Sequence, residues 1–385
     1  MLKNKLKKAL FTFLAIGIVG SLTSCQRGTT VNALTVGTEV KTLALMVVPN
    51  SDRIDILDMK DNRITQSLKT DNRPTSIAAS TSGRLILVTN YNSGTVSVFL
   101  RKDNQEFETL GSIGQGKNPI GVVFNPKHKE AYVVYQGDSK VLVLDTSNEN
   151  SAPRIINTIN LSGSNPEKVV VSKDGNNVFI TDNNKTGSRV ITLVRTSATS
   201  FRQSYSQTFT SSSDVGSVQL DGMVVDDNNR LFIANSAGSG IFVFDGKTGQ
   251  LSTTINLQDS TITGSRTVGP KNLLLYTNKT TSKQKIYVTG YSASVVSVID
   301  VTTLQRTKTI PLDKATSGRE ANNPVGIALG TSSSNEDIIY ITNTAGLTIS
   351  IIDPVQDILK RNISTTMSSS FQAPLGEVVS VGTIL

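Results

Sequence analysis

The sequence has very few of the residues from which reactive sites and covalent cross-links are built. Its 385 residues include one cysteine, Cys25, and one histidine, His128. A lone cysteine cannot form a disulfide within the chain. The sequence also has no Cys–His spacing typical of zinc, no haem motif and no glycine-rich phosphate loop. Because a Ser–His pair for nucleophilic catalysis would depend on one histidine, the sequence shows no catalytic constellation.

The lone histidine and the positive charge both have plain explanations. His128 lies in the polar segment Asn125 to Glu130, which we interpret as a surface turn. The formal net charge is +8, but four lysines lie within the first eight residues. No basic run is interleaved with aromatic residues, so a nucleic-acid partner is not expected.

A repeat dominates the rest of the chain. Seven short lead-ins, most of them containing proline, each precede an apolar strand and follow one another at intervals of 45 to 54 residues. A period of this length with several short strands per unit is typical of a β-propeller. The lead-ins are Arg73-Pro74, Asn118-Pro119, Asn165-Pro166, Gln219-Leu220, Gly269-Pro270, Asn323-Pro324 and Ala373-Pro374.

The sixth unit shows what one repeat contains. Runs rich in β-branched and aromatic residues predict four strands, at Leu273 to Tyr276, Lys285 to Thr289, Val295 to Asp300 and Thr307 to Leu312. We therefore predict an all-β fold over residues 41–385: a seven-bladed β-propeller of four-stranded antiparallel blades. The absence of tryptophan argues against WD repeats and against quinoprotein propellers whose blades are fastened by tryptophan.

The two ends of this region predict how the ring closes. Lys41 to Leu68 supply a second, third and fourth strand but no first, whereas Pro374 to Val381 supply a first strand with nothing after it. We expect the N- and C-terminal strands to pair in one blade, which removes two exposed sheet edges. Glu377 falls where the other units have an apolar residue. Either it points into the central channel, or the closing strand is shifted in register by one residue.

The N-terminus predicts export and anchoring. Residues 1–24 have a lysine-rich start and a short apolar stretch, Ala9 to Gly20, as in a signal peptide. The sequence Leu22-Thr23-Ser24-Cys25 resembles a bacterial lipobox, which implies lipidation of Cys25 and a flexible tether over residues 25–40. Because Gln26 follows, we expect the outer membrane or periplasm, or the outer face of the cytoplasmic membrane in a single-membrane host.

The strands of three units resemble a known family. Lys285-Ile286-Tyr287-Val288-Thr289 followed by Val295 to Asp300 is similar to the YVTN repeat of surface-layer and cell-surface propellers, which lie near the lactonase-like seven-bladed group. Arg84 to Asn90 and Ile338 to Asn343 match again. The resemblance implies the fold and leaves the function open, because the shared residues belong to strands and turns.

Candidate ligand-binding residues are expected where the lead-ins enter the central channel. Glu167, Asp221 and Lys271 directly follow the lead-in in three successive units, and Arg73 precedes the matching proline in an earlier one. The alternative is that these are solvated residues around a water-filled channel. We expect no cofactor and no metal site. Acidic turns such as Asp226 to Asn229 and Asp182 to Asn184 leave calcium open, although Asp and Asn are also favoured by turns themselves.

The sequence therefore predicts a cell-envelope lipoprotein propeller that binds or scaffolds a protein, a polysaccharide or a small ligand. Its expected partners are the membrane, through the lipid anchor, and one such ligand. The alternative is a lactonase-like hydrolase with a site at the mouth of the central channel. A third class is a component of envelope assembly or of a surface layer.

Overall fold

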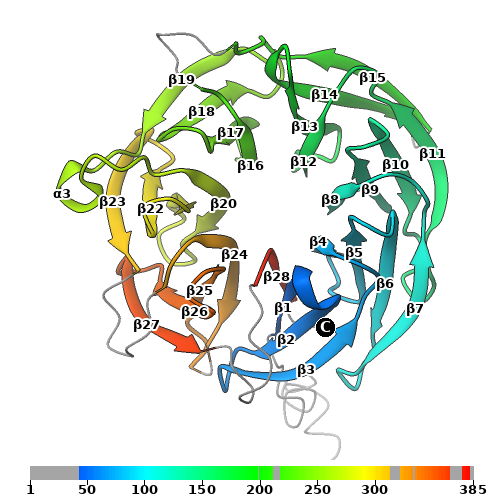
Figure 1. The fold of residues 1–385 in the computed structure, drawn as a ribbon, viewed down its shortest axis with the longest axis horizontal. Helices are drawn as coiled ribbons and strands as arrows, with labels where there is room; N and C mark the ends of the chain where they lie inside the picture. Colours follow the sequence, from blue (N-terminus) through cyan, green and yellow to red (C-terminus); the bar gives the residue numbers. More distant parts are fainter. Residues whose placement is uncertain are drawn as a thin grey trace, which may run out of the picture. The chain divides into compact units, whose positions relative to one another are not determined.

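The computed structural model describes residues 43–197, 199–210, 217–312, 321–332, 334–364 and 375–381. These residues form seven four-stranded antiparallel sheets arranged as the blades of a ring (Figure 1). The prediction of an all-β, seven-bladed propeller is confirmed. The predicted signal segment, Cys25 and the tether lie outside the described residues. No helix within the described ranges is long and apolar enough to cross a membrane.

Each blade runs from an inner strand at the channel to an outer strand at the rim (Figure 1). In that order, blade 1 contains β28 (Val378–Val381), β1 (Leu43–Val48), β2 (Arg53–Asp58) and β3 (Arg63–Lys69), and blade 2 contains β4 (Pro74–Ala79), β5 (Leu85–Asn90), β6 (Thr95–Arg101) and β7 (Phe107–Ile113). Blade 3 contains β8 (Pro119–Phe124), β9 (Glu130–Tyr135), β10 (Lys140–Asp145) and β11 (Arg154–Asn160), and blade 4 contains β12 (Pro166–Val171), β13 (Asn177–Asn184), β14 (Gly187–Ser197) and β15 (Ser200–Tyr205).

The last three blades repeat the pattern. Blade 5 contains β16 (Leu220–Val225), β17 (Arg230–Asn235), β18 (Gly240–Asp245) and β19 (Leu251–Asn256). Blade 6 contains β20 (Pro270–Thr277), β21 (Gln284–Gly290), β22 (Val295–Asp300) and β23 (Gln305–Pro311), and blade 7 contains β24 (Pro324–Thr331), β25 (Asp337–Asn343), β26 (Thr348–Asp353) and β27 (Ile358–Ser364). Two short helices, η1 (Pro49–Ser51) and α3 (Ser260–Thr263), lie in connections.

The middle strands are mostly apolar and buried because both faces of a blade are covered. All six residues of β5 and of β9 are buried, whereas the outer strand β27 has Asn362 as its one buried residue. The cores lie between blades: one cluster combines Tyr287 of blade 6 with Ile341 of blade 7, and another combines Met46 of blade 1 with Ile351 of blade 7. Burial of apolar surface between neighbours therefore holds the ring together.

Tyrosine hydroxyls add polar contacts between blades. The Tyr287 hydroxyl donates to the carbonyl oxygen of Pro354 in blade 7 at 2.9 Å, and the Tyr340 hydroxyl donates to the carbonyl oxygen of Met59 in blade 1 at 3.1 Å. Both rings are buried, and burial raises the pKa of each phenol. These contacts satisfy hydroxyl groups that would otherwise be costly to bury.

The two ends of the described propeller meet in blade 1. β28 pairs antiparallel with β1, with Met46 opposite Val378 and Leu43 opposite Val381. Blade 1 therefore takes its inner strand from the C-terminal part of the chain and its other three strands from the N-terminal part.

Candidate functional site

The inner strands of six blades share a β-bulge that brings two consecutive residues to the channel. In β12 the register shifts between Pro166 and Val169, and β16, β20, β24, β4 and β8 shift at the equivalent place. A bulge places two residues of one strand opposite one residue of its partner, and bulges are common beside active sites. Glu167 and Lys168 can therefore both contribute to the channel, although a regular strand would send them to opposite faces.

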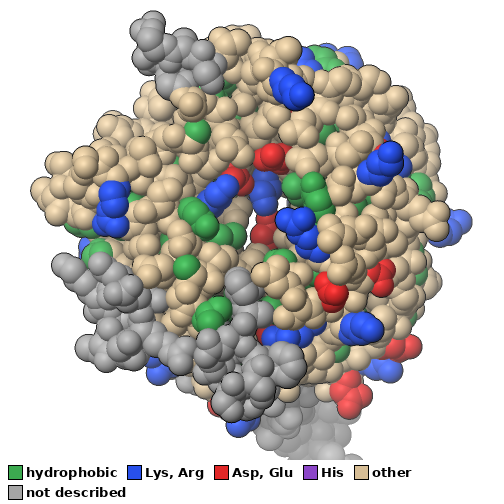
Figure 2. Space-filling view, in the orientation of Figure 1, with side chains coloured by type: hydrophobic (Ala, Val, Ile, Leu, Met, Phe, Trp, Pro, Cys, Tyr) green, Lys and Arg blue, Asp and Glu red, His purple; other side chains and the backbone are tan. Residues whose placement is uncertain are grey.

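The channel mouth is the end at which the lead-ins enter the inner strands. There the residue after each second strand donates its N–H to a lead-in carbonyl, as Tyr91 does to Arg73 at 2.8 Å and Gln136 does to Asn118 at 2.9 Å. The turns between second and third strands therefore form the rim of the mouth. Charged side chains of both signs gather around the central hole in the space-filling view (Figure 2).

A small cavity occupies the channel beneath the mouth. Its volume is about 150 Å³, and every blade contributes the residue that faces it at the same point of the repeat. Four of these residues are small and three are polar or charged with longer side chains, and from blade 4 round to blade 1 the longer side chains alternate with glycines. They are Ser76, Gly121, Lys168, Gly222, Asn272, Gly326 and Glu377.

Glu377 belongs to this set because the closing strand is shifted by one residue. Val378, not Glu377, lies opposite Met46, in the place that Ile77 takes opposite Val88 in blade 2. The Thr342 hydroxyl donates to the carbonyl oxygen of Gly376 at 2.7 Å. In the preceding blade the equivalent threonine, Thr289, donates to the carbonyl oxygen of Val325, the first residue after its proline. Gly376 is the second residue after Pro374, so this contact shows the same one-residue shift. The shift and the channel-facing side chain, which the sequence left as alternatives, therefore occur together.

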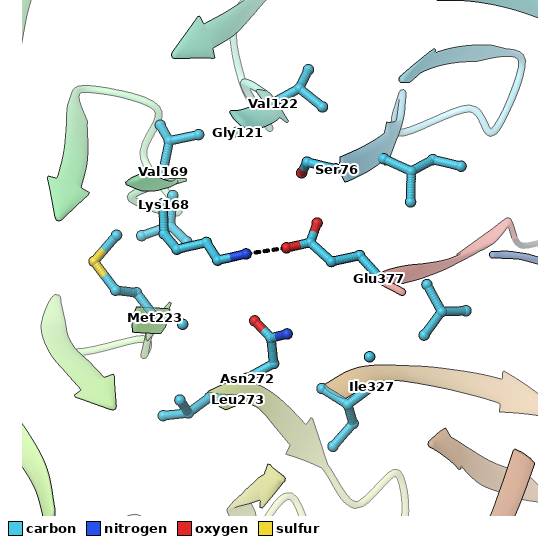
Figure 3. Close-up of a pocket in the computed structure, with 15 residues that line it drawn as sticks. Ser76, Gly121, Val122, Lys168, Val169, Met223, Asn272, Leu273, Ile327 and Glu377 are labelled. Carbon is cyan, nitrogen blue, oxygen red and sulfur yellow. Dashed lines mark hydrogen bonds and ion pairs between the residues drawn. The ribbon is translucent and has the colours of Figure 1, made fainter. Parts of the chain in front are cut away.

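Glu377 and Lys168 meet in the channel. Their side chains, from β12 and from the segment leading into β28, point toward one another and form an ion pair (Figure 3). A second pair joins Lys271 Nζ to Asp221 Oδ2 at 2.6 Å. Burial by itself would lower the pKa of Lys168, but the carboxylates of Glu377, Asp221 and Glu167 outweigh it and raise that pKa, which keeps the amine protonated.

Glu167 has a perturbed pKa. Burial raises the pKa of Glu167, and the negative charge of Asp221 raises it further. The hydrogen bond from Asn183 Nδ2 to Oε2, at 2.9 Å, acts in the opposite direction, as do the charges of Lys168 and Lys271. A partly buried carboxyl group beside two ammonium groups is a candidate general acid or base.

Three of the four predicted site residues thus lie in one charged cluster, and the fourth lies on the rim. We use "channel cluster" for Glu167, Lys168, Asp221, Lys271 and Glu377. Arg73 instead lies over the ring of Tyr91, with 4.9 Å from the guanidinium carbon to the ring centroid. It connects to the cluster through intervening side chains: the Tyr91 hydroxyl donates to Gln136 Oε1 at 3.2 Å, and Gln136 Nε2 donates to Glu167 Oε1 at 3.5 Å.

The sequence reasoning did not select Lys168, Gln136 or Asn183. Lys168 directly follows Glu167, and the strand periodicity alone would place it on the other face. Gln136 follows β9 and Asn183 lies at the end of β13, and both donate their backbone N–H to a lead-in carbonyl at the mouth. That regularity is the signal by which they could have been found.

The other sequence features lie away from this cluster. His128 is in the turn between β8 and β9, where Asn125 Oδ1 accepts its backbone N–H at 3.0 Å. In the acidic turn, Asp226 accepts the backbone N–H of Arg230 and pairs with its guanidinium. Asp182 pairs with Arg189 at 2.8 Å. Across the described ranges, no group of three or more His, Cys, Asp and Glu side chains is placed to hold a metal ion.

Fold and site together define a seven-bladed propeller with a channel cluster of carboxylates and lysines at the mouth. The family described as SMP-30/Gluconolactonase/LRE-like region matches residues 38–282. The chain belongs to that family. The YVTN-repeat resemblance stays a prediction, and no curated protein sequence is significantly similar to the chain.

Solved structures share the fold at low sequence identity. The periplasmic gluconolactonase PpgL of Pseudomonas aeruginosa is 11% identical with a TM-score of 0.65, over 89% of this chain and 99% of that one. A candidate 6-phosphogluconolactonase from Bacteroides uniformis is 12% identical with a TM-score of 0.64, over 89% and 99%. The dihydro-heme d1 dehydrogenase NirN is 12% identical with a TM-score of 0.57, and the match covers 85% of this chain but only 64% of that one. At identities this low, the similarity shows a shared fold only.

Proposed function

We propose that this protein hydrolyses a small hydroxylated lactone at the mouth of its central channel. One observation carries the proposal: Glu167, a partly buried carboxyl group held by Asn183, lies close enough to the ammonium groups of Lys168 and Lys271 for their charges to act on it. Membership of a family named for gluconolactonase supports the choice of a lactone as the substrate. The fold alone would not decide the reaction, since one propeller architecture hosts many functions.

The cluster provides the groups that this reaction needs. The Glu167 carboxylate accepts a proton from a water molecule while the water oxygen forms a bond to the lactone carbonyl carbon. The developing oxyanion lies near an ammonium group, either Lys168 or Lys271, which stabilises its charge. The bond from the carbonyl carbon to the ring oxygen then breaks, and the ring oxygen takes the proton back from Glu167. Lactone and water thus give one hydroxy acid, and the enzyme is unchanged.

The size of the channel limits the substrate. The cavity of about 150 Å³ is smaller than the roughly 300–1,000 Å³ of pockets that enclose drug-sized ligands. The ion pair between Lys168 and Glu377 crosses it and forms a floor beneath the mouth. A single sugar-sized ring held at the mouth agrees with this geometry better than a polymer threaded through the channel.

The test is the enzyme-dependent release of acid from D-glucono-1,5-lactone in a pH-stat, above the spontaneous rate. Glu167→Gln should reduce kcat/KM by roughly 100-fold or more, the usual contribution of a general base. Glu106→Gln, on an exposed turn between β6 and β7, is the matched control and should retain the parent rate. If Glu167→Gln retains parental activity, Glu167 is not the base.

A second candidate is a binding module whose charged groups at the mouth hold a polar ligand: a protein, a polysaccharide or a small molecule. The observation in its favour is that Lys168 and Lys271 are already paired with carboxylates, so the cluster is stable without a substrate. Calorimetry separates the two functions. If the protein is a binding module, Glu167→Gln binds D-gluconate with the same affinity as the parent, and the parent releases no acid from the lactone.

We also propose that the protein is exported and anchored at the cell envelope by acylation of Cys25. The support is the lysine-rich start, the apolar stretch and the lipobox-like Leu22 to Cys25. Cys25→Ala should leave an unprocessed precursor and abolish labelling with radioactive palmitate. Labelling that persists in this variant would contradict acylation of Cys25.

A further inference from the structure

Arg73 holds an unusual backbone conformation at the mouth. Its φ is +58°, in the left-handed region that costs a residue with a Cβ atom about 1–2 kcal/mol. The equivalent lead-in residues in blades 3, 6 and 7 have the same conformation, but they are Asn118, Gly269 and Asn323. Asparagine and glycine are the residue types that tolerate this region. An arginine at this point of the repeat is therefore disfavoured by the fold.

The fold supports the backbone of Arg73 without using its side chain. Asp52 Oδ1 accepts the backbone N–H of Arg73 at 2.8 Å, and the Arg73 carbonyl accepts the N–H of Tyr91. In the described part of the chain, the guanidinium makes no ion pair, and its one recorded contact is the face of the Tyr91 ring. The side chain is exposed. A strained residue with an exposed, unpaired charge is a reason to look for a ligand.

A chain of side-chain contacts connects the guanidinium to the channel cluster. Tyr91, on which it lies, donates its hydroxyl to Gln136, and Gln136 donates to Glu167. Three successive blades thus connect Arg73 to the proposed base along the rim. The channel cluster itself contains three carboxylates and two lysines, so it has no surplus positive charge for an additional anionic substituent. Arg73 supplies a positive charge at the side of the mouth.

We propose that Arg73 is a specificity-determining residue that binds an oxyanion substituent, a phosphate or a second carboxylate, of the lactone substrate. This inference rests on the proposed function and names its substrate class: an anionic sugar lactone in place of a neutral one. Guanidinium is suited to this role because its planar donors bind phosphate and carboxylate in pairs. The contact with the face of the Tyr91 ring holds the guanidinium at the rim of the mouth.

The test compares the binding of three open-chain probes by calorimetry. D-Gluconate has the carboxylate that hydrolysis releases, 6-phosphogluconate adds a phosphate, and D-glucarate adds a second carboxylate. The parent should bind one of the latter two roughly 10- to 100-fold more tightly than D-gluconate, as expected for a charge-assisted contact. Which of the two it prefers identifies the substituent. In Arg73→Asn this preference should fall to about one.

Arg73→Asn keeps the test independent of misfolding. Asparagine occupies this position in blades 3 and 7, so the variant should unfold at a urea concentration no lower than the parent. Lys127→Gln, in the exposed turn between β8 and β9, removes a positive charge elsewhere and should keep the parental preference. A preference that survives in Arg73→Asn, or is absent from the parent, would overturn the role of Arg73. That result leaves hydrolysis of D-glucono-1,5-lactone untouched, so the two proposals fail separately.

Discussion

Removal of Lys168 should destabilise the propeller more than removal of its partner Glu377. The two side chains are 24% and 18% exposed, between an exposed pair, worth about 0–1 kcal/mol, and a fully buried one, which costs about 3–5 kcal/mol to break. Lys168→Met leaves the carboxylates of Glu167, Asp221 and Glu377 with Lys271 alone. We expect a loss of about 2 kcal/mol. Glu377→Gln leaves Lys168 beside two carboxylates and should cost about 1 kcal/mol.

The assay is urea unfolding of the parent, both single variants and the double variant. The double-mutant cycle should give a coupling energy of about 1 kcal/mol, because Lys168 keeps the nearby carboxylates of Asp221 and Glu167 when Glu377 is removed. Glu377→Gln that costs as much as Lys168→Met would refute the reasoning, since the asymmetry follows from the surplus of carboxylates. A coupling energy near zero would show that the channel pair does not form in solution.

Two further predictions follow from the same contacts. Asp221→Asn removes a carboxylate that raises the pKa of Glu167. The acid limb of the pH–rate profile, which rises as Glu167 loses its proton, should therefore move to lower pH. An acid limb that stays in place would show that ionisation of Glu167 does not control the rate. Tyr340→Phe removes the hydrogen bond to the Met59 carbonyl between blades 7 and 1 and should lower the free energy of unfolding by about 1 kcal/mol, measured in urea; an unchanged midpoint would show that this contact adds no stability.

The fold could be predicted because its signal is repeated. One blade alone has short apolar runs that also fit other folds, but the lead-ins return seven times with strands of similar pattern between them. The continuous burial of β5 and β9 explains the lack of alternation within these runs. Each blade has neighbours on both faces, so a middle strand has no polar side to show.

The site was only partly predictable because it depends on backbone register. Position in the repeat identified Glu167, Asp221 and Lys271, which do cluster. Lys168 was missed because its contribution depends on a bulge, and a bulge adds one residue without a distinctive residue type. Glu377 stood out because an acidic residue occupies a position that is apolar in the other units. Its role depends on a one-residue shift that is set by pairing with β1, far away in the sequence.

The most direct test of the central claim is a crystal structure of the parent protein soaked with D-gluconate. The account predicts that the ligand lies at the channel mouth, with its carboxylate within hydrogen-bonding distance of Lys168 or Lys271 and with Glu167 beside the same carbon. Ligand found instead in the groove lined by Lys60, Lys360 and Arg361 between blades 1 and 7, with the mouth empty, would contradict it.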